Sequence, residues 1–169
     1  MLLRCLAILA MMLLFAMSPR IASATDEIDP YVAAANEAGV PLGVLVAIVG
    51  AESGYHPWAL DIEGRQVFCR SRAEAEAVLA GITTTNVDIG LMQINWRFWG
   101  PRLGIAKSRL LDPRINLLTG ARILRDGLNR NGSIWRRISN YHSGDTRERE
   151  RYNRQVYDAY VRYMRGDLR

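Results

Sequence analysis

The chain has 169 residues, of which 49% are hydrophobic and 23% are charged, and its formal net charge is +5. This length suits one domain with a substantial core, and the chain shows no internal repeat, low-complexity tract or second domain. Two histidines and two cysteines are too few, and wrongly spaced, for a histidine-rich or zinc site. We therefore expect no metal ion and no cofactor.

Residues 1–24 have the form of a secretory signal peptide. Arg4 supplies the positive charge, residues 6–17 are an unbroken apolar run, and Ala22-Ser23-Ala24 matches the small-x-small cleavage pattern. We expect export to the periplasm with cleavage after Ala24, which leaves residues 25–169 as the domain. The apolar run is short for a transmembrane helix, and an uncleaved membrane anchor is the alternative.

The mature chain is mildly basic. Removing residues 1–24 takes away Arg4 and Arg20 but no acidic residue, so 20 basic side chains remain against 17 acidic ones, a net charge of about +3. That charge suits an anionic polymer without requiring nucleic acid. The arginine-rich stretch 147–165 begins with alternating signs, which is typical of a solvated helix surface and not of a phosphate track. Cys69 remains without an internal partner, and we expect it to pack as a small buried residue.

Four segments are predicted in the first half of the domain: helices over residues 29–38, 40–53 and 71–80, and a small β-hairpin over residues 58–68. Gly39 and Gly81 are helix stops. Ser71 and Glu74 form a capping box at the start of the third helix. Residues 81–88 are expected to be a polar connection.

The second half is predicted to be helical. Asp112 before Pro113 is a helix start, and the helix that follows has one apolar face: Leu117, Ala121, Leu124 and Leu128. Gly132 would end that helix, and Ser133 would cap a short one with three side chains inward: Trp135, Ile138 and Tyr141. The last helix, over residues 147–165, carries one stripe: Tyr152, Val156, Tyr160 and Tyr163. Of Trp96, Phe98 and Trp99, at least two should pack in the core.

Glu52 is the only carboxylate inside the longest apolar run of the mature chain. The apolar face of its helix continues from Leu45 and Val49 to Glu52, so the carboxyl group should be held against apolar neighbours. Such surroundings raise the pKa of a carboxyl group and allow it to donate a proton near neutral pH. The plainer interpretation is a wetted helix end, because Gly54 and Pro57 follow closely.

Three short motifs stand in order along the chain: residues 52–57 (ESGYHP), 88–95 (DIGLMQIN) and 140–144 (NYHSG), the last after the helix that contains GARIL. In this order they resemble the lysozyme-like lytic transglycosylases. The resemblance spans roughly residues 28–165. It is greatest to the small single-domain type associated with conjugation, type IV and type III secretion, and pilus assembly. It implies a lysozyme-like α+β fold that is mainly α with a small β-hairpin.

The resemblance also implies a substrate and a reaction. The substrate would be peptidoglycan glycan strands, and components of a secretion, conjugation or pilus apparatus would be further partners. The bond cut would be the β-1,4 link from N-acetylmuramic acid to N-acetylglucosamine. The muramyl C6 hydroxyl would attack its own anomeric carbon and leave a 1,6-anhydro product. One carboxyl group is enough, because Glu52 can protonate the leaving oxygen and then accept the hydroxyl proton.

Residue by residue, the resemblance makes Glu52 the catalytic residue and gives five substrate-binding candidates: Ser53, Gly90, Met92, Gln93 and Tyr141. Ser53 would orient the site, the next three would line the sugar groove, and the Tyr141 hydroxyl would approach Glu52. Asn95 is a weaker candidate. The chain departs from the family at His142, where asparagine is usual, and in a longer segment between Glu52 and Gly90.

Two other functions remain open. A hydrolytic lysozyme would need a second positioned carboxylate, and the possible sources are Asp61, Glu63, Asp88 and Asp145. Asp61 and Glu63 read as solvated turn residues, and Asp88 reads as a possible turn cap, so none shows the required paired geometry. A non-catalytic wall-binding assembly protein could keep the same fold, although the retained Glu52 argues against it.

Overall fold

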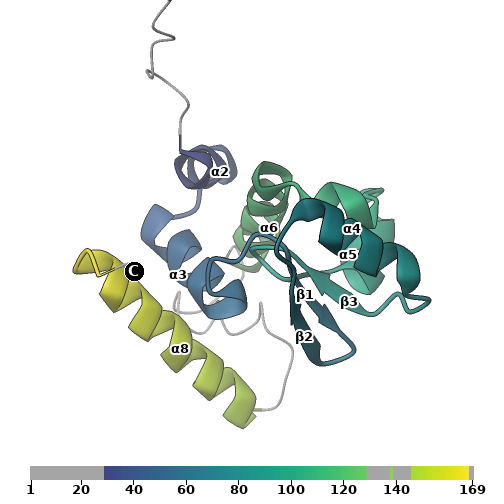
Figure 1. Cartoon of the computed structure of the whole chain (residues 1–169). Helices are drawn as coiled ribbons and strands as arrows, with labels where there is room; N and C mark the ends of the chain where they lie inside the picture. The colour runs from purple at the N-terminus through teal and green to yellow at the C-terminus, as the bar shows by residue number, and fades with distance from the viewer. Residues whose placement is uncertain (1–28, 129–137, 139–145, 168–169) are drawn as a thin grey trace, which may run out of the picture.

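The computed structural model describes residues 29–128, 138 and 146–167 (Figure 1). Its helical elements are α2 (Pro30–Ala38), α3 (Leu42–Ser53), α4 (Arg72–Gly81), α5 (Trp96–Leu103), the 3₁₀ helix η2 (Lys107–Leu111), α6 (Pro113–Leu128) and α8 (Thr146–Met164). Its strands are β1 (Ala59–Ile62), β2 (Arg65–Phe68), β3 (Val87–Ile89) and β4 (Ile94–Asn95). The prediction of a mainly α domain with a small β element is confirmed. Several predicted features lie outside the described residues: the signal peptide, Gly132, Ser133, Trp135, Tyr141 and His142.

Helix α3 passes through the middle of the core. Leu45, Ile48 and Val49 have no solvent exposure, because this helix carries apolar residues on nearly all sides. Helix α8 runs alongside α3 (Figure 1) and buries Val156 against it. The two helices approach closely at Gly43, where a Cβ atom would lie 2.9 Å from the ring of Tyr160.

Helices α2 and α6 pack against each other and complete the helical part. The Asp29 side chain caps α2 by accepting from the Tyr31 N–H at 2.8 Å. The Asp112 side chain caps α6 by accepting from the N–H groups of Arg114 and Ile115. The predicted apolar face of α6 is confirmed by its burial: Leu117, Ala121, Leu124 and Leu128.

The strands form one antiparallel sheet in the order β2-β1-β3-β4. The predicted hairpin is confirmed, with Glu63 and Gly64 at positive φ in its turn. The predicted polar connection over residues 81–88 was wrong at its end, because β3 begins at Val87. Strands of three and two residues are too short to show an alternating pattern. They are defined by pairing, β3 with β1 and β4 with β3.

Local signals around the sheet have mixed outcomes. The capping box of α4 is confirmed in part. Ser71 accepts from the Glu74 N–H at 3.2 Å, but the Glu74 carboxylate accepts from the Arg70 N–H.

Two of the three aromatics, Trp96 and Trp99, pack against the core as predicted, and Phe98 is 48% exposed.

Cys69 is buried within the core cluster, as expected for a packed small residue.

None of the helices in the described ranges has both the length and the apolar character needed to span a lipid bilayer. Helices α2 and α3 meet the length and composition criteria only as a pair, with a bend of 117° between them.

Candidate active site

Glu52 lies in the last turn of α3, where the helix ends sharply. Gly54 caps the helix in the left-handed conformation at φ 59°, and Tyr55 follows at φ 67°. The ring of Tyr55 then folds back over Gly50, where a Cβ atom would lie 2.6 Å from the tyrosine hydroxyl. Only glycine fits at position 50 without a shift. The chain then enters β1 at Ala59, so the sheet begins seven residues after Glu52.

The Glu52 carboxylate is fixed by a tyrosine from α8. The Tyr152 hydroxyl donates to Glu52 Oε1 at 2.6 Å, between residues 100 positions apart in the chain. Tyr152 is only 5% exposed. A short hydrogen bond from a buried phenol to a carboxylate is charge-assisted and holds the acceptor in one orientation. The hydrogen bond from Tyr152 therefore fixes the orientation of the Glu52 carboxyl group.

The surroundings of Glu52 raise its pKa from 4.5 to about 7, and the largest cause is burial. The hydrogen bond from Tyr152 acts in the opposite direction, because it stabilises the ionised form. The negative charge of Asp88 on β3 raises the pKa further. Glu52 therefore holds a proton close to neutral pH, which is the property required of a general acid there.

The GLMQ motif forms a tight turn after β3, and Asn116 of α6 holds it. Asn116 has no solvent exposure, and its Oδ1 accepts from the Met92 N–H at 2.8 Å. Its Nδ2 donates to the carbonyls of Ile89 and Leu110. Gly90 sits at φ 78° directly against this amide, where a Cβ atom would lie 2.4 Å from Asn116 Nδ2. Glycine is thus required at position 90 by both φ and contact.

Four of the five predicted substrate-binding residues are described: Ser53 follows Glu52, and Gly90, Met92 and Gln93 belong to this turn. Several of their side chains point inward. Ser53 is buried, and its hydroxyl donates to the Val49 carbonyl at 3.2 Å. Met92 has no exposure and packs against Gly120. Gln93 is half-buried at φ 43°, and its Nε2 donates to the carbonyls of Ala59 and Gly90. These side chains contact the protein itself, so they support the backbone at the end of α3 and in the turn.

The family resemblance implies that the Tyr141 hydroxyl approaches Glu52, and Tyr141 lies outside the described part of the chain. The structure adds Tyr152 in this position. In the sequence, Tyr152 is the first residue of the stripe along the last helix. A stripe along one face of a helix indicates only that its residues are buried. It does not show whether a buried tyrosine also donates a hydrogen bond to a carboxylate on another helix.

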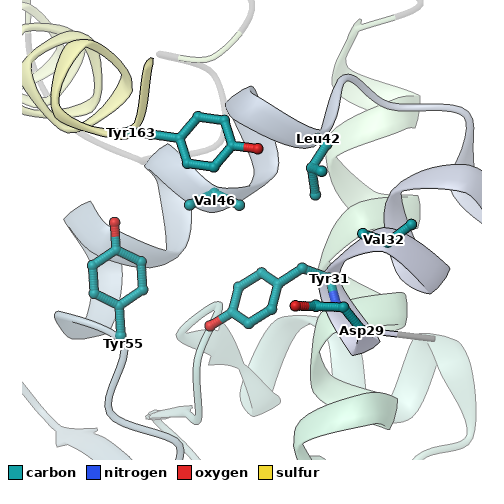
Figure 2. Close-up of a pocket in the computed structure, with 7 residues that line it drawn as sticks. All are labelled: Asp29, Tyr31, Val32, Leu42, Val46, Tyr55 and Tyr163. Carbon is teal, nitrogen blue, oxygen red and sulfur yellow. The ribbon is translucent and has the colours of Figure 1, made fainter. Parts of the chain in front are cut away.

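A hollow with a volume of about 240 Å³ lies beside α3 (Figure 2). Its wall includes three tyrosines, Tyr31, Tyr55 and Tyr163, together with Leu42 and Val46 of α3. None of the predicted site residues lines it. The wall is mostly apolar and lacks Glu52, so we place the chemistry at the end of α3 and not in this hollow.

Metal binding has no support in the residues that the structure describes. No group of three or more His, Cys, Asp or Glu side chains among them lies close enough together to hold an ion.

Replacing Tyr152 with phenylalanine should raise the pKa of Glu52, because the hydrogen bond that favours the ionised carboxylate is lost. The measurement is a ¹³C NMR titration of the Glu52 carboxyl group. Tyr157→Phe, which changes an exposed tyrosine of the same helix, is the control and should leave the titration unchanged. A Glu52 midpoint that stays the same or falls in Tyr152→Phe would contradict the assigned hydrogen bond.

Comparison with known proteins places the chain in a family. The profile of the transglycosylase SLT domain matches residues 29–162. The chain belongs to this family, and the resemblance seen in the three motifs is confirmed.

Curated relatives match a part of the chain. The invasion protein IagB of Salmonella typhimurium (strain LT2) is 36% identical over 89 residues, which cover 48% of this chain and 54% of that protein. The type IV secretion system protein virB1 of Brucella abortus (strain 2308) is 30% identical over 86 residues, covering 48% of this chain and 36% of that protein. The chain thus spans about half or less of the relatives it matches. No solved structure matches significantly.

Proposed function

We propose that the chain is a lytic transglycosylase that cleaves the β-1,4 bond between N-acetylmuramic acid and N-acetylglucosamine in peptidoglycan. The observation that carries the proposal is Glu52: a half-buried carboxyl group with a pKa of about 7, aimed by Tyr152, in a chain of the transglycosylase SLT family. At neutral pH a large fraction of such groups is protonated, so proton donation to a glycosidic oxygen is available without a metal ion.

The reaction proceeds in two proton transfers through the same group. Glu52 first donates its proton to the bridging oxygen as the bond to the anomeric carbon breaks. The C6 hydroxyl of the same muramyl residue then bonds to that carbon, and its proton passes to the Glu52 carboxylate. Because the nucleophile belongs to the substrate, its effective concentration is already high. Glu52 ends the cycle protonated, and the products differ from those of hydrolysis by one water.

The cellular role in the proposal is local opening of the cell wall for a secretion, conjugation or pilus apparatus. Two relatives carry names that point this way, an invasion protein and a type IV secretion system protein. The proposal includes export to the periplasm, with residues 1–24 as a signal peptide removed after Ala24. Components of such an apparatus would be the protein partners. The mildly basic mature domain suits the anionic wall polymer.

Product analysis tests the reaction. Purified protein should release muropeptides from peptidoglycan sacculi that lack one water and carry no reducing end, as read by mass spectrometry before and after borohydride treatment. Products with a reducing end would replace the proposal with a hydrolytic lysozyme. That alternative is favoured by one observation, the charge of Asp88 acting on Glu52. Binding to sacculi without release would favour a non-catalytic assembly protein.

A further inference from the structure

Phe68, the last residue of β2, is an exposed aromatic residue beside the segment that carries Glu52. It is 54% exposed, and its ring meets the His56 ring edge to face, with the ring centroids 5.3 Å apart. The His56 N–H donates to the Ser53 carbonyl at 3.1 Å, and Ser53 directly follows Glu52 in the chain. Two contacts therefore connect the exposed ring to the residue next to Glu52.

Phe68 also adjoins the GLMQ turn. It pairs with Ala59 across the hairpin of β1 and β2, and directly paired residues of antiparallel strands are close neighbours. The Ala59 carbonyl accepts from the Gly90 N–H at 2.8 Å and from Gln93 Nε2 at 3.2 Å. Phe68 thus lies next to two of the three motifs, in the segment between Glu52 and Gly90 that is longer here than is usual in the family.

The ring of Phe68 stands on the face of the sheet that is turned away from the core. Side chains alternate between faces along a strand, so Phe68 shares its face with Gln66 and not with Val67. On the opposite face, Leu60 pairs with Val67 and with Ile89. Leu60 and Ile89 are at most 1% exposed, which identifies that face as the core side.

Polar side chains continue the outer face across the other strands. Gln66 pairs with Asp61 on β1. Asp61 pairs with Asp88 on β3, and Asp88 pairs with Asn95 on β4. Gln66 is exposed and the other three are half-buried. The outer face therefore presents a row of amide and carboxylate groups that starts beside the Phe68 ring.

This combination of groups suits a carbohydrate. A pyranose ring has a flat side of C–H groups, which can pack on an aromatic ring, and a rim of hydroxyl groups that donate and accept hydrogen bonds. Amide and carboxylate side chains are suitable partners for such hydroxyl groups. An apolar protein partner would require a larger apolar patch, whereas the neighbours of Phe68 on this face are polar.

We propose that Phe68 is a substrate-binding residue, whose ring packs against a sugar unit of the glycan strand while the polar row of the sheet binds hydroxyl groups of the same strand. This inference rests on the proposed function. It adds to the site a contact from the hairpin, which the sequence motifs do not include.

Replacing Phe68 with alanine should weaken binding of the glycan strand and leave the chemical step intact. The substitution removes the ring but leaves Glu52 and its hydrogen bond from Tyr152 in place. The apparent Kd and the apparent KM should rise roughly 3- to 10-fold, while kcat changes little, because the contact is made before and during the reaction alike. The fold should be retained, because Phe68 is exposed.

Binding is measured by cosedimentation with purified peptidoglycan sacculi, in a Glu52→Gln parent so that the polymer is not cleaved. Phe68→Tyr keeps a flat ring and should bind as the parent does. Phe68→Leu keeps an apolar side chain without the flat ring and should bind almost as weakly as Phe68→Ala. The apparent KM and kcat are then measured from muropeptide release by the proteins that retain Glu52.

Phe98→Ala is the matched control. Phe98 is 48% exposed on α5, and its ring contacts Trp99 and Arg102 of the same helix. Its removal should leave binding to sacculi unchanged. An equal loss of binding in Phe98→Ala, or undiminished binding in Phe68→Ala or Phe68→Leu, overturns the inference, and so does a parent protein that does not sediment with sacculi.

The two proposals fail in different ways. If the chain with Glu52 binds sacculi but releases nothing, the proposed function fails, and the cosedimentation of the Phe68 variants still decides the role of the ring. If muropeptides are released and Phe68→Ala has an unchanged KM, the ring contact is removed from the site and the reaction at Glu52 stands.

Discussion

Glu52→Gln should abolish the release of muropeptides while leaving the fold intact. Glutamine has the same shape as the glutamic acid and can still accept a hydrogen bond from Tyr152, but its amide N–H groups are too weakly acidic to transfer a proton to the glycosidic oxygen. General acid catalysis contributes roughly 10²- to 10⁴-fold to a rate, so we expect a loss of at least about 100-fold. The measurement is product release from sacculi by wild-type and variant protein at equal concentration and at pH 6.

The stability of the same variant provides an independent check. Folding raises the pKa of Glu52 from 4.5 to about 7, so the folded protein holds this proton more tightly than the unfolded chain does. That stabilisation is complete below the unfolded pKa and is lost as the pH rises through the folded one. Glutamine does not titrate. Relative to wild type, the variant should gain stability between pH 4.5 and 7, by up to about 3 kcal/mol.

The control for Glu52 is another glutamate on a helix. Glu76 of α4 is exposed and pairs with Arg72 in an i,i+4 salt bridge. Such pairs contribute less than about 1 kcal/mol, so Glu76→Gln should keep full activity and nearly full stability. Substantial activity in Glu52→Gln, with a folded spectrum, would remove Glu52 from the mechanism and the transglycosylase reaction from the proposal.

The helices could be predicted from the sequence because their signals are local. The cap at Asp112, the stop at Gly39 and the apolar periodicity of α6 each involve residues within a few positions of one another. The hairpin of β1 and β2 has the same local character. Strands β3 and β4 are different, because β3 is defined by its pairing with β1, more than 20 residues earlier in the chain.

The candidate site could be predicted only in part, for the same reason. Glu52 was recognisable because its own helix is apolar, and that pattern is contained within one segment. Tyr152 meets Glu52 across 100 positions, and Asp88 acts on Glu52 from the sheet. Neither the stripe that contains Tyr152 nor the motif that contains Asp88 indicates in the sequence that the residue acts on Glu52. The inward direction of Met92 likewise depends on the distant Gly120.

Asn116→Ala should destabilise the domain strongly, although alanine is the better helix former. Asn116 is fully buried and makes three hydrogen bonds to the backbone around the GLMQ turn, to Met92, Ile89 and Leu110. Alanine leaves all three backbone groups without this partner. Each buried polar group left unsatisfied costs about 1–3 kcal/mol, so we expect a loss of roughly 3–5 kcal/mol, and a fall in Tm of roughly 10 °C.

Two further variants test whether this loss of stability comes from the buried hydrogen bonds of Asn116. Asn36→Ala, on the exposed side of α2, should change stability by less than about 0.5 kcal/mol. Asn116→Asp keeps the acceptor for the Met92 N–H but sets a carboxylate against the carbonyls of Ile89 and Leu110. It should therefore be destabilised further as the carboxyl group ionises. Thermal unfolding measured across pH distinguishes these cases. If Asn116→Ala unfolds within 2 °C of wild type, Asn116 does not hold the turn, and the position of Gly90 beside the site must have another cause.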